Sequence, residues 1–494
     1  MIGRIKELKL LSNACESNKS ELISVYGRRR IGKTYLINYM FKEHRKECLF
    51  FRFTGSYLLD SNTQRENFIE SIYDWFGVEP TKEINSWMNA FNFLKRTIDS
   101  EFKNKKVNEK VVIFLDEVPW IDKKNTNGFL GALGHFWNDY CEIKENVILI
   151  ICGSNSSWIK NKIFEDTQGP LYQRLTHKIH LKPFTLKETA SYLIDEKNFD
   201  IDSKTIFEVY MVFGGVAKYL SFLNPKLSLS ENIDNLFFNI DGHLYKEYDD
   251  IFKSLFQDKS KFYTSIIQYL CTKQSGFTQT QIASGLDISM GAKLKDGIND
   301  LIECGFIQGL SKYNQKTNAK YIISDPYCLF HNKWVKEHSK NDIANLSKPY
   351  WTSIQSSSQY SIWTGFIFEI VCLTNIEMYL DARNTKGLSK SHSYWNFVSS
   401  NENEKGAQID ILVEYQNNVY DIVECKFYND EFVISKDYKD NLQNKLSMFK
   451  KYGLKGKYEI KLIMLTTYGC KHNSHYNSLN IADDITIDDL LFRY

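Results

Sequence analysis

Residues 22–34 read LISVYGRRRIGKT, and this stretch decides the fold class of the N-terminal part of the chain. The run LISVY favours a β-strand, and the residues after it form the pattern G-x-x-x-x-G-K-T. In this pattern Gly27 and Gly32 let backbone N–H groups turn towards a phosphate. Lys33 reaches the outer phosphates, and the hydroxyl of Thr34 holds Mg²⁺. Because a helix follows at once and points its positive end at the same anion, we expect a nucleotide-phosphate site on an α/β domain.

Two further apolar runs end in polar residues that suit the same chemistry. Residues 111–117, VVIFLDE, predict a buried strand that ends in Asp116 and Glu117. We expect Asp116 to hold Mg²⁺ through water and Glu117 to polarise the attacking water, because phosphoryl transfer depends on positioning and charge neutralisation. A third strand ends just before Ser154 and Asn155. Either side chain could sense the γ-phosphate or simply cap a loop, and Ser154 is the candidate for nucleotide binding.

These motifs resemble those of the prokaryotic AAA+-like ATPases of the archaeal ATPase family. The resemblance rests on short segments spread over the first 220 residues: IGR at 2–4, EL at 7–8, GRRRIGKT at 27–34, LDEVP at 115–119, GS at 153–154, PLYQR at 170–174, LKPF at 181–184 and GGVAKYL at 214–220. It implies ATP and Mg²⁺ as cofactors, ATP hydrolysis, and a domain over residues 1–245 that ends in a helical lid.

The resemblance also bears on assembly. Such ATPases often complete the site with an arginine from a neighbouring subunit, which makes a homo-oligomer one option and Arg174 the best-placed candidate. Gln173 stands where the family usually has glycine, and Ala217 where it usually has proline. These departures weaken the case for Arg174 as the arginine that reaches a neighbouring site and for Lys218 as a nucleotide sensor in the lid. Three arginines, residues 28–30, fill the variable positions of the phosphate loop, as a basic rim or as contacts to nucleic acid or another subunit.

Residues 246–328 have the outline of a winged helix-turn-helix. Residues 278–286 and 291–304 read as two helices joined by a tight turn, and a strand-like hairpin with Lys312, Lys316 and Lys320 follows as the wing. The second helix mixes lysines with acids, whereas groove readout favours arginine, lysine or asparagine. DNA contact and a structural or protein-docking role both remain open for this module.

Residues 329–360 are polar, serine-rich and poorly periodic, which predicts a linker, and residues 361–494 form the last domain. There Glu369 lies in an apolar helix, where a lone carboxylate is costly unless it is paired or bound to a metal. A predicted hairpin carries Asp410 on its first strand and Glu424 and Lys426 on its second. Side chains two apart share a strand face, so Glu424 and Lys426 project together.

This combination resembles the PD-(D/E)xK nuclease superfamily, which has a restriction-endonuclease-like α/β fold. The resemblance implies Glu369, Asp410 and Glu424 as Mg²⁺ ligands, and Asp410, Glu424 and Lys426 as catalytic residues for DNA hydrolysis. Gln443 and Lys445 on the next helix are weaker candidates for contacts to this site.

Composition excludes some classes of protein but does not by itself indicate a function. Lysine plus arginine number 62 against 60 acids, so any nucleic-acid site must be a local patch. The ten cysteines form no C-x-x-C pair, which fits a reducing cytoplasm, and the apolar runs are far shorter than the ~20 residues of a membrane helix. The sequence therefore predicts an ATP-hydrolysing, cytoplasmic protein coupled to a metal-dependent DNA endonuclease. The alternative is an ATPase switch that binds DNA or a protein and carries a non-catalytic nuclease-like domain.

Overall fold

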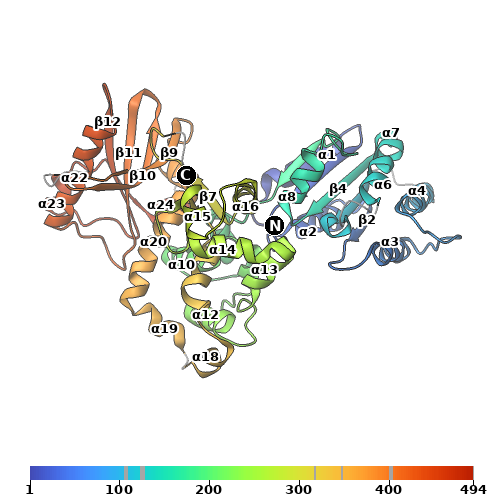
Figure 1. The fold of residues 1–494 in the computed structure, drawn as a ribbon, viewed down its shortest axis with the longest axis horizontal. Coiled ribbons are helices and arrows are strands. Elements are labelled where there is room, and N and C mark those ends of the chain that lie inside the picture. The colour runs from blue at the N-terminus through green and yellow to red at the C-terminus, as the bar shows by residue number, and fades with distance from the viewer. Residues whose placement is uncertain (105–109, 123–127, 316–318, 347–348, 400–403, 493–494) are drawn as a thin grey trace. The chain divides into compact units, whose positions relative to one another are not determined.

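The computed structural model describes the chain except residues 105–109, 123–127, 316–318, 347–348, 400–403 and 493–494 (Figure 1). The chain divides into two compact units, Met1–Lys182 and Pro183–Tyr494, and each is described by itself. The boundaries expected from the sequence, after residues 245, 328 and 360, all fall within the second unit; the first stays a prediction, and the segment between the other two is described below.

A five-stranded parallel sheet forms the centre of the first unit. Its strands are β1 (Glu21–Tyr26), β2 (Leu49–Thr54), β3 (Val111–Asp116), β4 (Val147–Gly153) and β5 (His177–His180). The order across the sheet is β2-β3-β4-β1-β5, and each neighbouring pair is parallel. Strands β3 and β4 are buried along their whole length, which explains their continuous apolar sequence. The predicted α/β fold with a parallel sheet is thereby confirmed.

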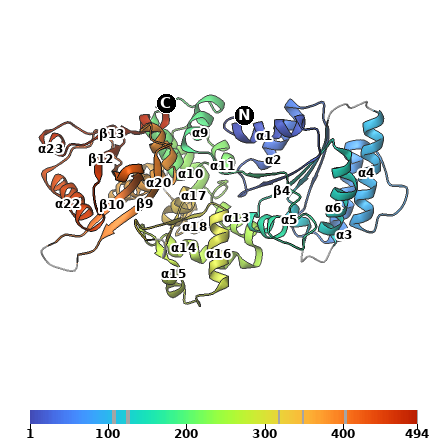
Figure 2. The ribbon, with the colours of Figure 1, turned by 90° about the horizontal axis from the view of Figure 1, so that it is seen from above.

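Helices cover both faces of this sheet (Figure 2). On one face lie α1 (Ile5–Glu16) and α2 (Lys33–Asn38), which continues into a wider turn over Tyr39–His44. On the other lie α3 (Ser61–Phe76), α4 (Trp87–Asn104), α6 (Phe129–Phe136) and α8 (Ser156–Ile159), with π-helical turns at Trp137–Cys141 and Lys160–Phe164. Two short helices, α5 (Val118–Ile121) and α7 (Glu142–Lys144), complete the unit.

The second unit begins with helices. They are α9 (Leu186–Ser191), a π-helical turn at Tyr192–Glu196, α10 (Ser203–Phe213), α11 (Ala217–Ser221), α12 (Leu229–Phe237), α13 (Glu247–Phe256) and a 3-10 turn at Gln257–Lys259. The next part alternates helices and short strands: α14 (Ser260–Leu270), β6 (Phe277–Thr278), α15 (Gln279–Gly285), α16 (Ala292–Glu303), β7 (Ile307–Leu310) and β8 (Lys320–Ile323). The three strands pair antiparallel in the order β6-β8-β7.

The segment predicted as a linker, residues 329–360, is instead folded and packed. It contains part of α17 (Pro326–Phe330), a π-helical turn (His331–Val335), α18 (Lys340–Asn345), α19 (Tyr350–Gln355) and the start of α20 (Ser358–Thr374). Trp351 is fully buried, and its backbone N–H donates to Asp234 Oδ1 at 2.9 Å. The prediction was wrong because helices of five or six residues are too short to show the 3.6-residue period, while their tryptophans supply the burial.

A second five-stranded sheet closes the chain. Its strands are β9 (Ser389–Phe397), β10 (Ala407–Tyr415), β11 (Val419–Lys426), β12 (Glu459–Thr466) and β13 (Asp483–Thr486), in the order β13-β12-β11-β10-β9. Strands β9, β10 and β11 are antiparallel, whereas β11, β12 and β13 are parallel. Helix α22 (Lys436–Tyr452) covers one face and α20, α21 (Ile376–Ala382) and α24 (Ile487–Phe492) the other; a 3-10 turn (Gln416–Asn418) and α23 (Ser474–Asn477) lie in connections.

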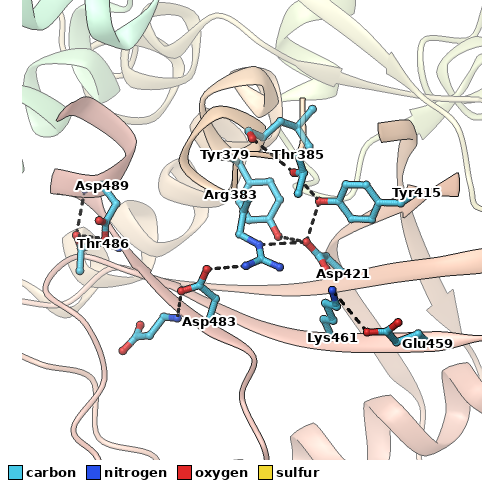
Figure 3. Close-up of polar contacts among 12 residues, drawn as sticks. Tyr379, Arg383, Thr385, Tyr415, Asp421, Glu459, Lys461, Asp483, Thr486 and Asp489 are labelled. Carbon is cyan, nitrogen blue, oxygen red and sulfur yellow. Dashed lines mark hydrogen bonds and ion pairs between the residues drawn. The ribbon is translucent and has the colours of Figure 1, made fainter. Parts of the chain in front are cut away.

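A buried polar network fixes one end of this sheet (Figure 3). Asp421 on β11 is fully buried and accepts hydrogen bonds from the hydroxyls of Tyr379 at 2.7 Å and Tyr415 at 2.8 Å. Arg383 contacts Asp421 at 3.4 Å and Asp483 on β13 at 2.6 Å. The network therefore ties helix α21 to three strands and pairs the buried charge.

Within the described ranges, no single helix is long and apolar enough to cross a membrane. Helices α20 and α21 pass that test together by length and composition, but they are bent by 76° at the break between them.

Candidate nucleotide site and candidate acidic site

The G-x-x-x-x-G-K-T loop connects β1 to α2, as its sequence predicts. Gly27 has φ 141°, and a Cβ atom there would lie 2.1 Å from the carbonyl oxygen of Leu181, so the position requires glycine. Gly32 has φ 95° and precedes the first residue of α2. Two glycine-dependent conformations thus shape the loop at the carboxyl end of the sheet.

The Lys33 side chain is buried in this loop. Its ammonium donates to the carbonyl oxygens of Gly27 at 2.8 Å and Arg28 at 2.9 Å. Carbonyl oxygens hold the cation where phosphate oxygens could replace them. Arg28 is itself buried, so the expected basic rim of three exposed arginines is wrong at this position, whereas Arg29 stacks on Trp120 at 5.8 Å.

Strand β3 brings the two predicted acids to the same edge. The Thr34 hydroxyl donates to Asp116 Oδ2 at 2.7 Å, and Asp116 is buried. Glu117 follows in a left-handed conformation, with φ 49°, and its Oε2 accepts from the backbone N–H of Ser154 at 3.1 Å and from its hydroxyl at 2.8 Å. Asn155 instead caps helix α8 through Trp158 N–H at 2.9 Å. Ser154 thus contacts Glu117 and Asn155 caps a helix, and the assignment of Ser154 to nucleotide binding stays a prediction.

A hydroxyl paired with a carboxylate is the hard-oxygen chemistry that Mg²⁺ prefers. Across the described parts of the chain, no three His, Cys, Asp or Glu side chains form a ready metal cluster. Mg²⁺ at nucleotide sites needs none, because it binds through one or two protein oxygens, water and phosphate oxygens. Thr34 and Asp116 therefore fit such an ion.

Arg52 on β2 also contacts this site, which the sequence motifs did not predict. Its guanidinium lies 3.2 Å from Asp116 Oδ2, the oxygen that Thr34 also contacts. The signal was available, because Arg52 stands inside the otherwise apolar strand LFFRFT, where a charge is costly without a partner.

Two residues were candidates for roles outside the phosphate loop: Arg174 for the contact with a neighbouring subunit and Lys218 for the lid. Both make contacts within their own part of the chain. Arg174 forms an exposed ion pair with Glu142 at 3.5 Å. Lys218 in α11 lies over the ring of Phe222 at 4.7 Å.

In the second unit the structure brings the predicted acidic residues together. Glu369 lies on α20, Asp410 on β10 and Glu424 on β11. Burial, followed by the negative charge of Asp410, raises the pKa of Glu369 to about 8. The same two causes raise the pKa of the fully buried Glu424 to about 7. The three carboxylates are therefore close enough to repel one another.

Two residues of α22 complete this acidic site. Lys445 contacts both carboxylate oxygens of Glu424 at 2.7 Å, and the Tyr438 hydroxyl donates to Oε2 at 3.0 Å. Lys445 was a weak candidate in the sequence and Tyr438 was missed, because contacts across many residues leave no local pattern. Lys426 donates to the Cys425 carbonyl at 3.1 Å and lies over the Tyr438 ring at 5.1 Å. Gln443 is exposed on the same helix.

The donor chemistry of the acidic site suits a divalent cation, although two of its carboxylates already have partners within the protein. Asp410 Oδ2 accepts from the Cys425 N–H at 3.1 Å, and both oxygens of Glu424 face the ammonium of Lys445. No three acids in the described residues share a metal-binding position. The expected ligands Glu369, Asp410 and Glu424 thus lie near one another, and Lys445 supplies the local positive charge; their role as metal ligands stays a prediction.

Comparison with known proteins agrees with the geometry of the first unit. Residues 1–223 match the model of an ATPase domain found predominantly in Archaea. The match supports an ATPase domain of the archaeal type over residues 1–223.

Individual relatives are more distant. The uncharacterized protein MJECL04 of Methanocaldococcus jannaschii is 25% identical over 379 residues, which are 75% of this chain and 76% of that protein. The Walker-type ATPase PABY2304 of Pyrococcus abyssi is 16% identical with a TM-score of 0.49, over 67% of this chain and 96% of that chain. The ORC2 protein of Aeropyrum pernix, in ADPNP and ADP complexes, is 12% identical with a TM-score of 0.36, over 70% of this chain and 95% of that chain.

Proposed function

We propose that the first unit binds ATP with Mg²⁺ in the Gly27–Thr34 loop and hydrolyses it. Lys33 holds the outer phosphates, and Thr34 and Asp116 hold the ion, which would supply charge neutralisation on the phosphates. Glu117 polarises the attacking water, and Ser154 orients Glu117. Lys33, Thr34, Asp116 and Glu117 meet at the carboxyl edge of one parallel sheet, and the Thr34–Asp116 contact is the single observation that carries this proposal.

Two substitutions separate phosphate binding from water activation. Lys33→Ala should abolish binding of a fluorescent ATP analogue, because nothing else in the loop supplies that ammonium. Glu117→Gln should bind the analogue normally but hydrolyse ATP roughly 100-fold or more slowly, as expected for loss of a general base. Ser154→Ala removes the hydroxyl contact to Glu117 and keeps the backbone N–H contact, so its rate of ATP hydrolysis should lie between those of the wild type and Glu117→Gln. Wild-type hydrolysis by the Glu117 variant would remove that residue from the reaction.

For the second unit we propose a metal-dependent DNA endonuclease activity, with Asp410, Glu424 and Lys426 as the catalytic residues. Support comes from three repelling carboxylates and two lysines at one end of a mixed sheet, beside helix α22. Because Lys445 covers Glu424, a metal ion must displace or share that contact. We further propose that the protein is cytoplasmic and that it self-associates, with Arg174 of one subunit completing the ATP site of its neighbour.

Variants of the acidic site test this second activity. Asp410→Ala and Lys426→Ala should each eliminate Mg²⁺-dependent DNA cleavage, while Gln443→Ala, an exposed neighbour, should not. Glu369→Ala should be milder, costing roughly 10–100-fold if Glu369 only tunes the ion. DNA binding that remains should weaken steeply with salt as counterions are released. Cleavage by the Asp410 variant would contradict the assignment.

The alternative is a switch in which nucleotide state controls binding of DNA or protein. One observation bears on it, because the hairpin expected to be a wing packs on the second sheet. Tyr313 N–H donates to the Tyr394 carbonyl at 3.0 Å, its hydroxyl donates to Tyr420 at 2.9 Å, and Lys320 lies over the Tyr394 ring at 4.9 Å. Lys316 lies outside the described residues. The element order of residues 260–323 supports a winged helix, and this packing favours the structural role over a DNA-reading wing.

DNA contact by this module would then fall to α16, where Lys293, Lys295 and Asn299 are exposed. Substituting all three with alanine should leave DNA affinity unchanged if the module is structural. A loss of affinity with a shallower salt dependence would favour the DNA-binding switch.

A further inference from the structure

Arg52 occupies an unusual position for a charged side chain. Strand β2 alternates faces, so Arg52 shares a face with Phe50 and Thr54. The parallel register pairs Arg52 with Phe114 and Thr54 with Asp116, which places all of them on the face covered by α1 and α2. The side chain is 26% exposed. A guanidinium in this apolar setting costs free energy unless a negative charge pairs with it.

The pairing is with one oxygen of Asp116. Arg52 Nη2 lies 3.2 Å from Oδ2, and the Thr34 hydroxyl donates to the same Oδ2 at 2.7 Å. The guanidinium also stacks over the Phe114 ring at 5.6 Å. The Arg52 Nε–H is buried and has no hydrogen-bond partner among the described residues, so Asp116 is the anion that holds this group.

We propose that Arg52 is a positioning residue that acts through Asp116, as a built-in cation that competes with hydrated Mg²⁺ for Oδ2. This inference rests on the proposed Mg²⁺–ATP site. Without nucleotide, Arg52 neutralises the buried carboxylate and disfavours a second positive charge beside it. The negative charge of ATP offsets that repulsion, so the ion binds together with the nucleotide rather than alone.

The test is the Mg²⁺ dependence of nucleotide binding in the full chain. A fluorescent ATP analogue is titrated with Mg²⁺ in the wild type, Arg52→Gln, Arg52→Met and Arg52→Lys. Both neutral variants should reach half-saturation at a Mg²⁺ concentration roughly fivefold or more below that of the wild type, a size typical of coupling between two ligands. Arg52→Lys keeps the charge but loses the planar contact to Phe114, so its half-saturating Mg²⁺ concentration should lie closer to that of the wild type than those of the two neutral variants do. Arg45→Gln, at an ion pair with Glu16 outside the site, is the matched control and should show no change.

Thermal unfolding with Mg²⁺ alone gives a second reading that does not depend on nucleotide. The neutral variants should melt lower than the wild type without Mg²⁺, because Asp116 loses its partner, and Mg²⁺ should raise their midpoint more than it raises that of the wild type. Arg52→Met keeps an apolar side chain packed on Phe114, so it controls for destabilisation caused by lost packing rather than by lost charge.

Several outcomes overturn the proposal. An unchanged or higher Mg²⁺ requirement in the neutral variants would make Arg52 a structural partner of Asp116 and nothing more. The same conclusion follows if both variants stay unfolded when Mg²⁺ is added. If instead the wild type binds the analogue without any Mg²⁺ dependence, the proposed metal site itself fails, which is a separate result.

Discussion

His331 is a buried histidine that makes stability depend on pH. Its ring stacks on Tyr248 at a centroid distance of 4.3 Å, and burial lowers its pKa from 6.5 to about 3. The unfolded chain takes up the proton below about pH 6.5, whereas the folded chain resists it until about pH 3. Folding stability from this group is therefore complete above pH 6.5 and is lost as the pH falls.

We expect His331→Phe to remove this acid sensitivity. At pH 4 the wild type should have lost roughly 3 kcal/mol of unfolding free energy through His331, relative to pH 8. The variant keeps an aromatic ring on Tyr248 and should lose correspondingly less, measured by urea unfolding at the two pH values. His472→Phe is the control, because His472 stacks on Tyr476 at 4.2 Å but is exposed. An equal pH dependence in the His331 variant and the wild type would contradict the assignment.

At the scale of elements, helix α22 and strand β11 are held together by one buried ion pair. Glu424 is fully buried, and although burial lowers the pKa of Lys445, the Glu424 charge raises it above its ordinary value. Removing one partner of such a pair leaves an uncompensated charge. Lys445→Met should therefore cost about 3 kcal/mol of unfolding free energy at pH 8, measured by urea unfolding.

Lys450 on the same helix is exposed and provides the matched control. Lys450→Met should change the unfolding free energy by less than about 0.5 kcal/mol. Equal effects of the two substitutions would show that the buried pair contributes nothing particular to stability.

Elements also show where sequence reasoning succeeds. The strand before Gly27, the strand ending at Asp116 and the helix after Lys33 follow from local patterns, because apolar runs and glycine-rich loops are encoded by neighbouring residues. The partners Arg52 and Lys445 were missed or undervalued because their contacts join residues 64 and 21 positions apart. Such pairs depend on strand order and helix packing, which cannot be predicted from the periodicity of neighbouring residues.

At the scale of the whole molecule, the first unit lies within the residues that match an archaeal-type ATPase domain, and the second unit combines a small three-stranded module with a mixed sheet that carries the acidic site. The two candidate sites lie in different compact units, with no residue in common. ATP hydrolysis should therefore survive the loss of key residues at the acidic site. Loss of DNA cleavage in those same variants separates a two-activity enzyme from a switch.

Measuring ATP hydrolysis and DNA cleavage on the same preparations tests the central claim most directly. With Mg²⁺ present, the account predicts that Glu424→Ala loses DNA cleavage and retains phosphate release within about twofold, because the two sites share no residue and lie in separate compact units. It also predicts that Lys33→Ala loses phosphate release. Cleavage that survives in the Glu424 variant would contradict the account. So would its absence from the wild type with Mg²⁺ and Mn²⁺ on single-stranded, double-stranded and branched DNA, a result that would leave the nucleotide-controlled switch as the function.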